Sequence, residues 1–362
     1  MRFHAKINFT TFKLVRRYVS ILTLLFLSSS VSSQVRYLIE GNIKGVPAPI
    51  IYLTYYTDEN NFQKDTSQIV NGKFKFKGSV IRPVLASLSL DGNSNAEWFY
   101  IDSGVISIEI KVDTFHYIRD VVQNVSIESI SGSQSEDAKR KMIVFYNQLK
   151  DKLLSQEQKS RILFNSQVAF VKKNPDHNLS SELLSQNDIL SYRDARKIFQ
   201  QLSVRQKQNA HQNGLLKSLQ RLKVTDPGKY FYYGKQYDTA NLPLNISKSN
   251  HRIMLVAFWA SNCLPCREMH KKFHFLYSEY QSKGLEIVGI SLDENRNNWI
   301  RATEVDKINW KNVSQTNGFM NSLVSYYSLE FIPFYLLLDK DNKILVRNPS
   351  YSFVESFLKK NL

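Results

Sequence analysis

The run Phe258-Trp259-Ala260-Ser261-Asn262-Cys263-Leu264-Pro265-Cys266-Arg267 contains the only two cysteines of this 362-residue chain. A disulfide between Cys263 and Cys266 would close a loop of very few residues, and the chain-entropy argument gives it roughly 2 kcal/mol of stabilisation. Such a bond adds little to the stability of a chain of this length. The spacing therefore indicates thiol–disulfide chemistry rather than a structural crosslink.

The sequence around the cysteines predicts a buried strand followed by a helix. Ile253–Trp259 is a continuous apolar run, as expected for a central strand buried on both faces. Beyond the cysteines, apolar residues recur at helical spacing, at Met269, Phe273, Leu276 and Tyr280. Cys263 should then lie at the helix N-terminus, where free N–H groups and the helix dipole favour a thiolate. We expect Cys263 to be the nucleophile and Cys266 to be the resolving thiol.

Three further motifs follow the cysteine run. They are the strand-like residues 284–293, the run Tyr327-Ser328-Leu329-Glu330-Phe331-Ile332-Pro333, and the hairpin-like residues 334–339 and 342–346. With the cysteine run, they make residues 228–362 resemble the TlpA/ResA-like thiol–disulfide oxidoreductases of the thioredoxin superfamily. The resemblance implies an α/β thioredoxin-like domain, in which Pro333 follows a cis peptide bond and Ile332 offers its backbone to an extended substrate beside the cysteines.

The resemblance also implies an enzyme that needs no cofactor. Its partners would be disulfide-bearing envelope proteins, whose disulfides Cys263 attacks and Cys266 then resolves. A membrane-borne electron donor would reduce the cysteine pair again. The family favours this reducing direction.

Three positions depart from the pattern of the family and of thioredoxins more widely. Asn262 stands where the family has Trp, Met269 where it has Glu, and Ala257 where thioredoxins have the buried Asp that moves protons to and from the second cysteine. These departures leave open both the direction of exchange and the route of the proton. They also support an alternative, a non-enzymatic envelope protein that binds a ligand or partner and uses the thioredoxin domain as a scaffold.

Two histidines follow Cys266 at four-residue steps. Cys266, His270 and His274 should therefore lie on one face of the helix, and with Cys263 they form a formal zinc set, so a metal carrier is a second alternative. The preferred interpretation has no metal, because common Cys₂His₂ sites place more residues between the two pairs. Attachment of c-type haem is excluded because Arg267, not His, follows Cys266.

The N-terminus has the features of a secretory signal. Arg2, Lys6, Lys13, Arg16 and Arg17 precede an apolar stretch and a serine-rich segment, with no acidic residue among residues 1–33. Val31 and Ser33 suit cleavage before Gln34, which predicts an exported protein of the periplasm or cell envelope. An uncleaved, membrane-associated anchor is the alternative, although residues 19–27 are shorter than the roughly 20 apolar residues of a spanning helix.

The chain before residue 228 divides into two further parts. Residues 35–130 carry β signals throughout, including the turn Asn71-Gly72 and the alternating Lys73-Phe74-Lys75-Phe76-Lys77, with the phenylalanines expected inside. We expect a small antiparallel β-sandwich here. Its opening, residues 37–45, resembles an N-terminal domain of unknown function that often precedes thioredoxin domains in exported proteins.

Residues 131–226 predict a basic helical connector. They hold 17 Lys and Arg against 9 Asp and Glu, and apolar residues recur at helical spacing. The excess charge could meet a membrane surface or an acidic partner, although such charge is usually a solvated helix face. No motif for nucleic acid accompanies it, so nucleic acid is not expected as a partner. The whole chain is thus predicted to be a multidomain protein with a β-sandwich, a helical connector and an α/β domain.

Overall fold

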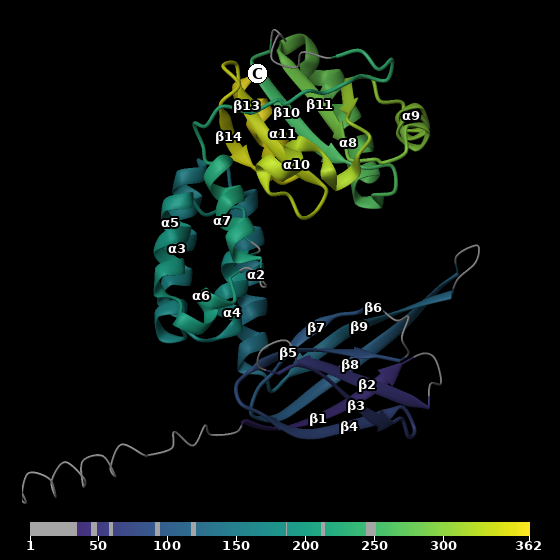
Figure 1. The fold of residues 1–362 in the computed structure, drawn as a ribbon, viewed down its shortest axis with the longest axis vertical. Coiled ribbons are helices and arrows are strands. Elements are labelled where there is room, and N and C mark those ends of the chain that lie inside the picture. The colour runs from purple at the N-terminus through teal and green to yellow at the C-terminus, as the bar shows by residue number, and fades with distance from the viewer. Residues whose placement is uncertain are drawn as a thin grey trace, which may run out of the picture. The chain divides into compact units, whose positions relative to one another are not determined.

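The computed structural model describes residues 35–44, 49–57, 61–90, 95–116, 121–185, 187–210, 214–243 and 251–362 (Figure 1). The predicted signal peptide, residues 1–33, lies outside these residues. The chain divides into two compact units, Met1–Ser133 and Gln134–Leu362, which are called the N-terminal unit and the C-terminal unit below. None of the helices in the described ranges combines the length and the hydropathy that crossing a bilayer requires.

The described part of the N-terminal unit consists of β-strands in two sheets. One sheet has the strand order β4-β1-β8-β9-β6 and the other has the order β3-β2-β5-β7. The strands are β1 (Val35–Lys44), β2 (Ile50–Tyr56), β3 (Phe62–Gln68), β4 (Lys73–Val80), β5 (Val84–Ser89), β6 (Asn95–Ala96), β7 (Trp98–Ile101), β8 (Gly104–His116) and β9 (Val121–Ser131). Side chains from both sheets share one hydrophobic core, as in the predicted sandwich.

Alternation along β4 sets which side chains enter this core. Phe74 and Phe76 are buried, whereas Lys73, Lys75 and Lys77 are exposed, which confirms the prediction. Most neighbouring strands pair antiparallel, as expected. The exceptions are β1 with β8 and β6 with β9, which run parallel. Alternation indicates which face of a strand is buried but not which strand lies beside it, so the sequence did not reveal these two pairings.

Helices α2 to α7 open the C-terminal unit and are called the helical segment. They are α2 (Gln134–Asp151), α3 (Gln156–Lys173), α4 (Asn178–Ser185), α5 (Tyr192–Gln201), α6 (Val204–Gln208) and α7 (Leu215–Val224). Serines begin several of them: Ser155 forms a capping box with Gln158, and Ser191 and Ser203 each accept a hydrogen bond from a backbone N–H in the first turn. Apolar faces of these helices meet in a core of their own.

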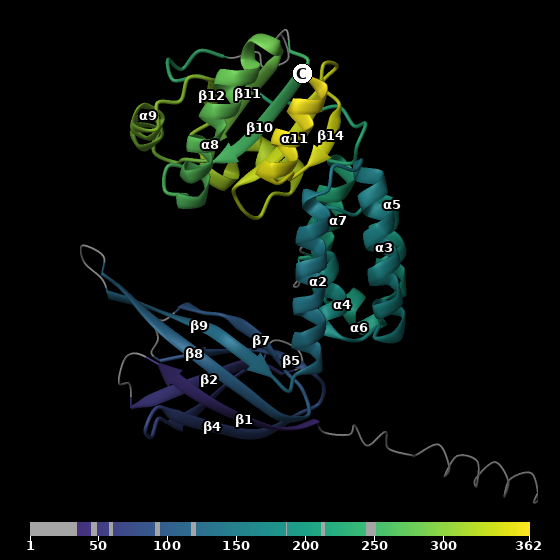
Figure 2. The same cartoon turned by 180° about the vertical axis from the view of Figure 1, so that it is seen from behind.

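A five-stranded sheet of order β12-β11-β10-β13-β14 forms the rest of the C-terminal unit (Figure 2). Its strands are β10 (Ile253–Trp259), β11 (Leu285–Ser291), β12 (Lys311–Ser314), β13 (Phe334–Asp339) and β14 (Ile344–Arg347). The helices around it are α8 (Leu264–Tyr280), η3 (Gln281–Lys283), α9 (Arg296–Val305), η4 (Gly318–Met320), α10 (Ser322–Tyr327) and α11 (Tyr351–Asn361). Strand β10 is parallel to β11 and antiparallel to β13.

The central strand β10 is buried along its whole length, as its apolar sequence predicts. Leu255 and Ala257 face a core that includes residues of α8 and α11. Val256 and Phe258 face the opposite core, which includes residues of α10. Helices therefore cover both faces of the sheet. After β10 the chain directly enters the loop 260–263, which carries Cys263 and is called the cysteine loop below.

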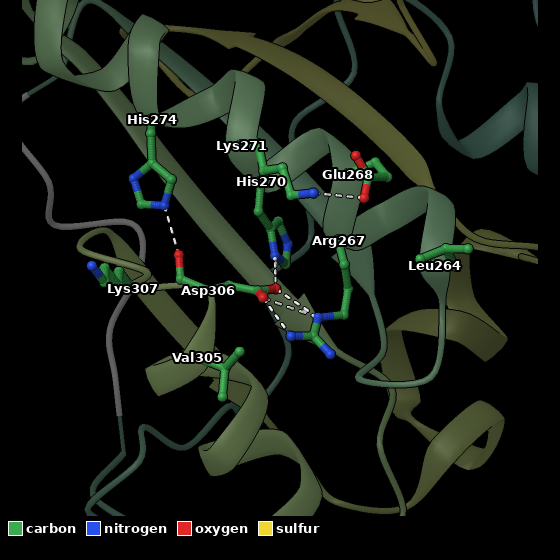
Figure 3. A pocket seen from close by; sticks show the side chains of 9 residues that line it. All are labelled: Leu264, Arg267, Glu268, His270, Lys271, His274, Val305, Asp306 and Lys307. Atoms are coloured by element: carbon green, nitrogen blue, oxygen red, sulfur yellow. Dashed lines mark hydrogen bonds and ion pairs between the residues drawn. The ribbon is translucent and has the colours of Figure 1, made fainter. Parts of the chain in front are cut away.

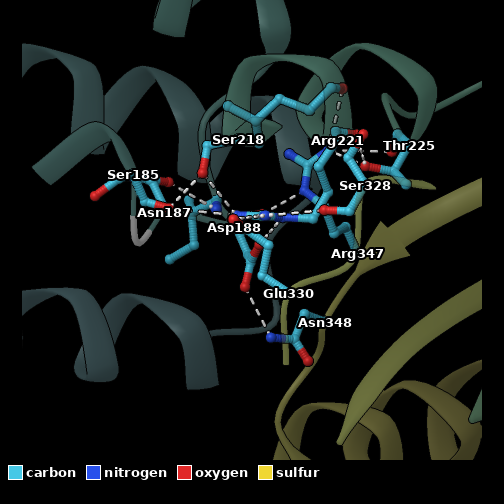
Figure 4. Close-up of polar contacts among 12 residues, drawn as sticks. Ser185, Asn187, Asp188, Ser218, Arg221, Thr225, Ser328, Glu330, Arg347 and Asn348 are labelled. Carbon is cyan, nitrogen blue, oxygen red and sulfur yellow. Dashed lines mark hydrogen bonds and ion pairs between the residues drawn. The ribbon is translucent and has the colours of Figure 1, made fainter. Parts of the chain in front are cut away.

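Arg347, the last residue of β14, joins the sheet to the helical segment (Figure 4). Its side chain is 2% exposed, and its guanidinium donates to the carbonyls of Asp188 (2.9 Å), Leu190 (2.6 Å) and Thr225 (3.1 Å). These acceptors lie in the connections before α5 and after α7. A single side chain from the sheet thus satisfies carbonyl groups at two places where helices end or begin.

The contact of Arg347 with Asp188, Leu190 and Thr225 is called the joint below. Asp188 lies at its centre. Its carboxylate accepts from Asn348 Nδ2 (2.8 Å), next to Arg347, and from Arg221 Nε (3.3 Å). Arg221 also approaches Glu330 at 3.6 Å, three residues before Pro333. The helical segment therefore contacts the residues on both sides of strand β13.

Candidate functional site

The two cysteines lie at the N-terminus of α8, as predicted. Cys263 is the N-cap residue, and its Sγ accepts a hydrogen bond from the backbone N–H of Cys266 at 3.3 Å. Pro265 occupies the first turn, where no N–H donor is needed. The free N–H groups of this turn and the helix dipole would stabilise a negative charge on Cys263.

Cys263 and Cys266 are joined in a disulfide with Cα atoms 5.3 Å apart. The two sulfurs differ in access. Cys263 is half-buried, whereas Cys266 is 1% exposed and packs in a small core with Trp259 and Trp299. A reactant from solvent therefore meets Cys263 first, and the roles of nucleophile and resolving thiol stay a prediction.

Asp293 holds the loop that carries Cys263. Its buried carboxylate accepts from the Ser261 backbone N–H at 3.0 Å and from the hydroxyls of Ser261 (2.5 Å) and Ser291 (2.7 Å). Asp293 comes just after β11, and Ser261 comes just after the neighbouring β10. The carboxylate thus fixes the start of the cysteine loop to the adjacent strand end.

Replacing Asp293 by alanine is expected to lower the free energy of unfolding of the C-terminal unit by about 2 kcal/mol, because Ser261 N–H and Ser291 Oγ–H would lose a charged acceptor. Asp341→Ala is the control, since that carboxylate lies on the surface and pairs with exposed Lys340. Thermal unfolding of the two variants measures the difference. Equal midpoints would contradict the anchoring role of Asp293.

The peptide bond between Ile332 and Pro333 is cis. Ile332 packs against the small core of Trp259 and Cys266, and so lies beside the cysteine pair. A cavity of about 450 Å³ is lined by Pro333 and Pro265 together with Met269, Tyr335 and Lys150 of α2. The fold thus brings Ile332 and Pro333, the cis-proline turn, next to the cysteine loop. Their role in substrate binding stays a prediction.

The two positions where thioredoxins or the resembled family carry an acid hold Ala257 and Met269 in this chain. Ala257 is buried in β10, and Met269 is half-buried in α8 on the wall of the cavity beside Pro333. Tyr335 lies in the same wall, and its buried hydroxyl has no hydrogen-bond partner among the described residues. Burial raises the pKa of Tyr335, so this hydroxyl stays protonated. A carboxylate for the second cysteine is therefore absent from both expected positions.

The two histidines of α8 both bind Asp306, the C-cap residue of α9 (Figure 3). His270 Nδ1 lies 2.9 Å from Asp306 Oδ2, and His274 Nε2 lies 2.7 Å from the Asp306 backbone oxygen. Arg267 donates to the same carboxylate from its Nε (2.8 Å) and Nη2 (2.5 Å). In Figure 3 the carboxylate lies between the side chains of Arg267 and His270.

The surroundings of Asp306 and His270 shift the pKa of both groups. Burial alone would raise the pKa of Asp306, but hydrogen bonds from Arg267 and His270 outweigh it and hold the pKa below its usual value. Burial lowers the pKa of His270, and the hydrogen bond with Asp306 only partly offsets this effect. Asp306 is therefore ionised and His270 is neutral near pH 7.

The zinc set considered from the sequence is not assembled. Among the described residues, no group of three or more His, Cys, Asp and Glu side chains is arranged to hold a metal. His270 and His274 are directed to Asp306, and the two sulfurs are bonded to each other. Helical periodicity placed the histidines on the face of Cys266 correctly, but it did not show that α9 supplies a partner for them.

Two acids of the site, Asp293 and Asp306, had no assigned role in the sequence. Asp293 follows strand β11 and Asp306 follows helix α9, both far from the cysteines along the chain. Asp306 is 36 residues from His270 along the chain. The one signal available was the position of Asp293 at the end of an apolar strand, where side chains of parallel strands gather at one edge of a sheet.

Two family models match parts of the chain. Residues 37–138 match a family described as a domain of unknown function (DUF4369), and residues 250–344 match a family described as thioredoxin-like. The first match covers most of the predicted β-rich part. The second includes the cysteine pair and the cis-proline turn.

Solved structures similar to the chain each cover less than half of it. One is the thioredoxin domain of a thiol–disulfide oxidoreductase from Bacteroides vulgatus, with 22% identity over 38% of this chain and 98% of that one and a TM-score of 0.35. Another is a thiol–disulfide oxidoreductase from Bacteroides fragilis, with 28% identity over 38% of this chain and 100% of that one and a TM-score of 0.34. No curated protein matches the chain.

Proposed function

We propose that this protein is an exported enzyme that reduces the disulfides of envelope proteins. The premise is that the C-terminal domain is thioredoxin-like and carries a disulfide-forming C-x-x-C pair, as in thiol–disulfide oxidoreductases. The observation that supports the proposal best is the unequal access of Cys263 and Cys266 at the N-terminus of α8. A crosslink that only stabilised the fold would need neither a thiolate-favouring helix end nor one accessible sulfur.

The proposed cycle begins with the reduced pair. The Cys263 thiolate attacks one sulfur of a substrate disulfide, so that the substrate S–S bond breaks and one substrate thiolate leaves. Cys266 then attacks the Cys263 sulfur, and the second substrate thiolate leaves. The substrate has gained two electrons, the Cys263–Cys266 disulfide has formed, and a membrane-borne electron donor reduces it again.

Substrate alignment is assigned to the cis-proline turn. The backbone of Ile332 would pair with an extended substrate segment, and Pro333 would keep that segment beside Cys263. Leu264, between the cysteines, is 70% exposed, and Phe331, next to Ile332, is also exposed. These side chains favour a substrate with apolar residues near its disulfide.

Location and partners follow from the sequence. The basic leader supports export to the periplasm or cell envelope, where substrates carry disulfides. The basic helical segment could add contact with an acidic partner or an anionic membrane surface. Cell fractionation of a tagged full-length chain tests the location, and recovery with cytoplasmic proteins would contradict it.

The reduction potential of the Cys263–Cys266 pair tests the proposed direction. A potential near −270 mV, the value of thioredoxin, together with catalytic reduction of insulin disulfides, is expected for a reductase. A potential near −120 mV would instead reverse the direction to oxidation. Cys263→Ala is expected to abolish turnover. Wild-type protein without any exchange activity would favour the non-enzymatic alternative, in which the domain is a scaffold.

A further inference from the structure

His270 lies one helical turn beyond Cys266 on the same face of α8. Side chains in a helix lean toward its N-terminus, so that a residue covers the turn three to four positions before it. His270 accordingly lies over the turn that contains Cys266 and Arg267. Both Cys266 and His270 also contact Trp259: Cys266 shares its small core, and the His270 ring packs edge-on against the indole at 4.6 Å between centroids.

Asp306 fixes the orientation of this imidazole. Because Asp306 Oδ2 lies 2.9 Å from His270 Nδ1, that nitrogen carries a proton and donates it. The other ring nitrogen, Nε2, is then the one that can accept a proton. Arg267 holds the carboxylate in place by three further hydrogen bonds, so the pair of Asp306 and His270 cannot rotate freely. This is the arrangement of a general base and the acid that orients it.

We infer that His270 is the proton acceptor for Cys266 and replaces the carboxylate that thioredoxins carry at the position of Ala257. The inference rests on the proposed function, because it assigns a role in the second step of that exchange. As Cys266 attacks the mixed disulfide, its thiol proton passes to His270 Nε2, a bond forms between the Cys266 and Cys263 sulfurs, and the substrate thiolate leaves. His270 becomes an imidazolium stabilised by Asp306, and it later returns the proton to water.

A cavity behind α8 provides the path to water. Its volume is about 560 Å³, and it is lined by His270, His274, Arg267 and Asp306 together with Leu264, Glu268, Lys271, Val305 and Lys307 (Figure 3). The imidazole is itself buried at the inner side of this cavity. A proton on His270 can therefore reach solvent through this cavity.

The groups that surround His270 set its titration. Asp306 from the end of α9 favours the imidazolium, while Arg267 and His274 on its own helix oppose it; Trp259 and Trp310 pack against the ring and do not titrate. Burial has the largest effect and lowers the pKa of His270 from the ordinary value. The neutral base is thus present at pH 7, and because its pKa is lowered it persists through the ordinary histidine value of about 6.5 and is lost only at lower pH.

Ellman's reagent separates the two steps in a stopped-flow experiment on the mature protein. The reduced protein releases one coloured thiolate when Cys263 attacks the reagent and a second when Cys266 resolves the mixed disulfide. In His270→Gln we expect the second release to slow by about 100-fold at pH 7 while the first keeps its rate. The variant should also lose the fall in the second rate that the wild type shows at acid pH.

His251→Gln is the matched control, because His251 binds the backbone oxygen of Asp339, at the end of β10 opposite the cysteines. It should keep both rates. His270→Ala should regain the second release when imidazole is added, since the cavity is open to solvent. Equal second rates in His270→Gln and wild type would overturn the inference, as would a slow His270→Ala that imidazole does not rescue. A wild type that shows no second release would instead contradict the proposed function.

Discussion

Cys266→Ser is expected to stop catalysis after a single exchange and to leave the protein covalently attached to its substrate. Cys263 is half-buried at the helix N-terminus and can still attack, but no second thiol is present to displace the substrate. Turnover on insulin disulfides should fall by at least about 1,000-fold, and non-reducing gels should show a stable adduct in a one-to-one ratio. The same variant made in cells would capture natural substrates.

Cys263→Ser provides the contrast. Its remaining thiol, on Cys266, is 1% exposed and packs against Trp259, so it should neither turn over nor accumulate an adduct. The asymmetry between the two variants depends on the unequal access of the two sulfurs and on the helix N-terminus, which favours the thiolate of Cys263. Adducts of equal yield would show that the two sulfurs are equally accessible, and the assignment of nucleophile and resolving thiol would then be wrong.

Arg347→Met is expected to lower the free energy of unfolding of the C-terminal unit by about 4 kcal/mol. Methionine can fill much of the volume of arginine, but it cannot donate to the carbonyls of Asp188, Leu190 and Thr225. Those buried oxygens would lose their donor, and the carboxylate of Asp188 would lose nearby positive charge. The loss far exceeds that of an ordinary surface arginine.

Arg161→Met measures how much free energy of unfolding is lost when an ordinary surface arginine is replaced. Arg161 is 74% exposed and pairs with Glu157 at 3.6 Å along α3, so its removal should cost less than about 0.5 kcal/mol. Urea unfolding of the full chain can be followed by fluorescence, because three of its four tryptophans, Trp259, Trp299 and Trp310, lie near the C-terminal sheet. If Arg347→Met were no less stable than Arg161→Met, the buried guanidinium would not be what holds the joint together.

Local patterns in the sequence were sufficient to predict the strand and the helix on either side of the cysteines. The apolar run Ile253–Trp259 is strand β10 with the same bounds, and the helical spacing that begins at Met269 is found in α8, where Phe273, Leu276 and Tyr280 are buried. Continuous apolar runs and helical periodicity are properties of neighbouring residues. They can therefore be read without knowledge of the tertiary structure.

Contacts between distant segments could not be obtained in this way. A single arginine at the end of a hairpin has the sequence pattern of a surface residue, and charged side chains are seldom buried, yet Arg347 is enclosed by helices more than 100 residues earlier in the chain. Asp306 likewise follows a different helix from the histidines that it binds. The sequence left a metal open as an alternative for those histidines because their contact with Asp306 is defined only by packing.

The joint at Arg347 also bears on how this protein can be divided. The family match begins at residue 250, and a fragment that starts there would look complete by sequence. It would nevertheless expose a guanidinium whose main acceptors, at Asp188, Leu190 and Thr225, had been cut away. We therefore expect a fragment that keeps the exchange chemistry intact to need the helices that begin at Gln134 as well as the thioredoxin-like part.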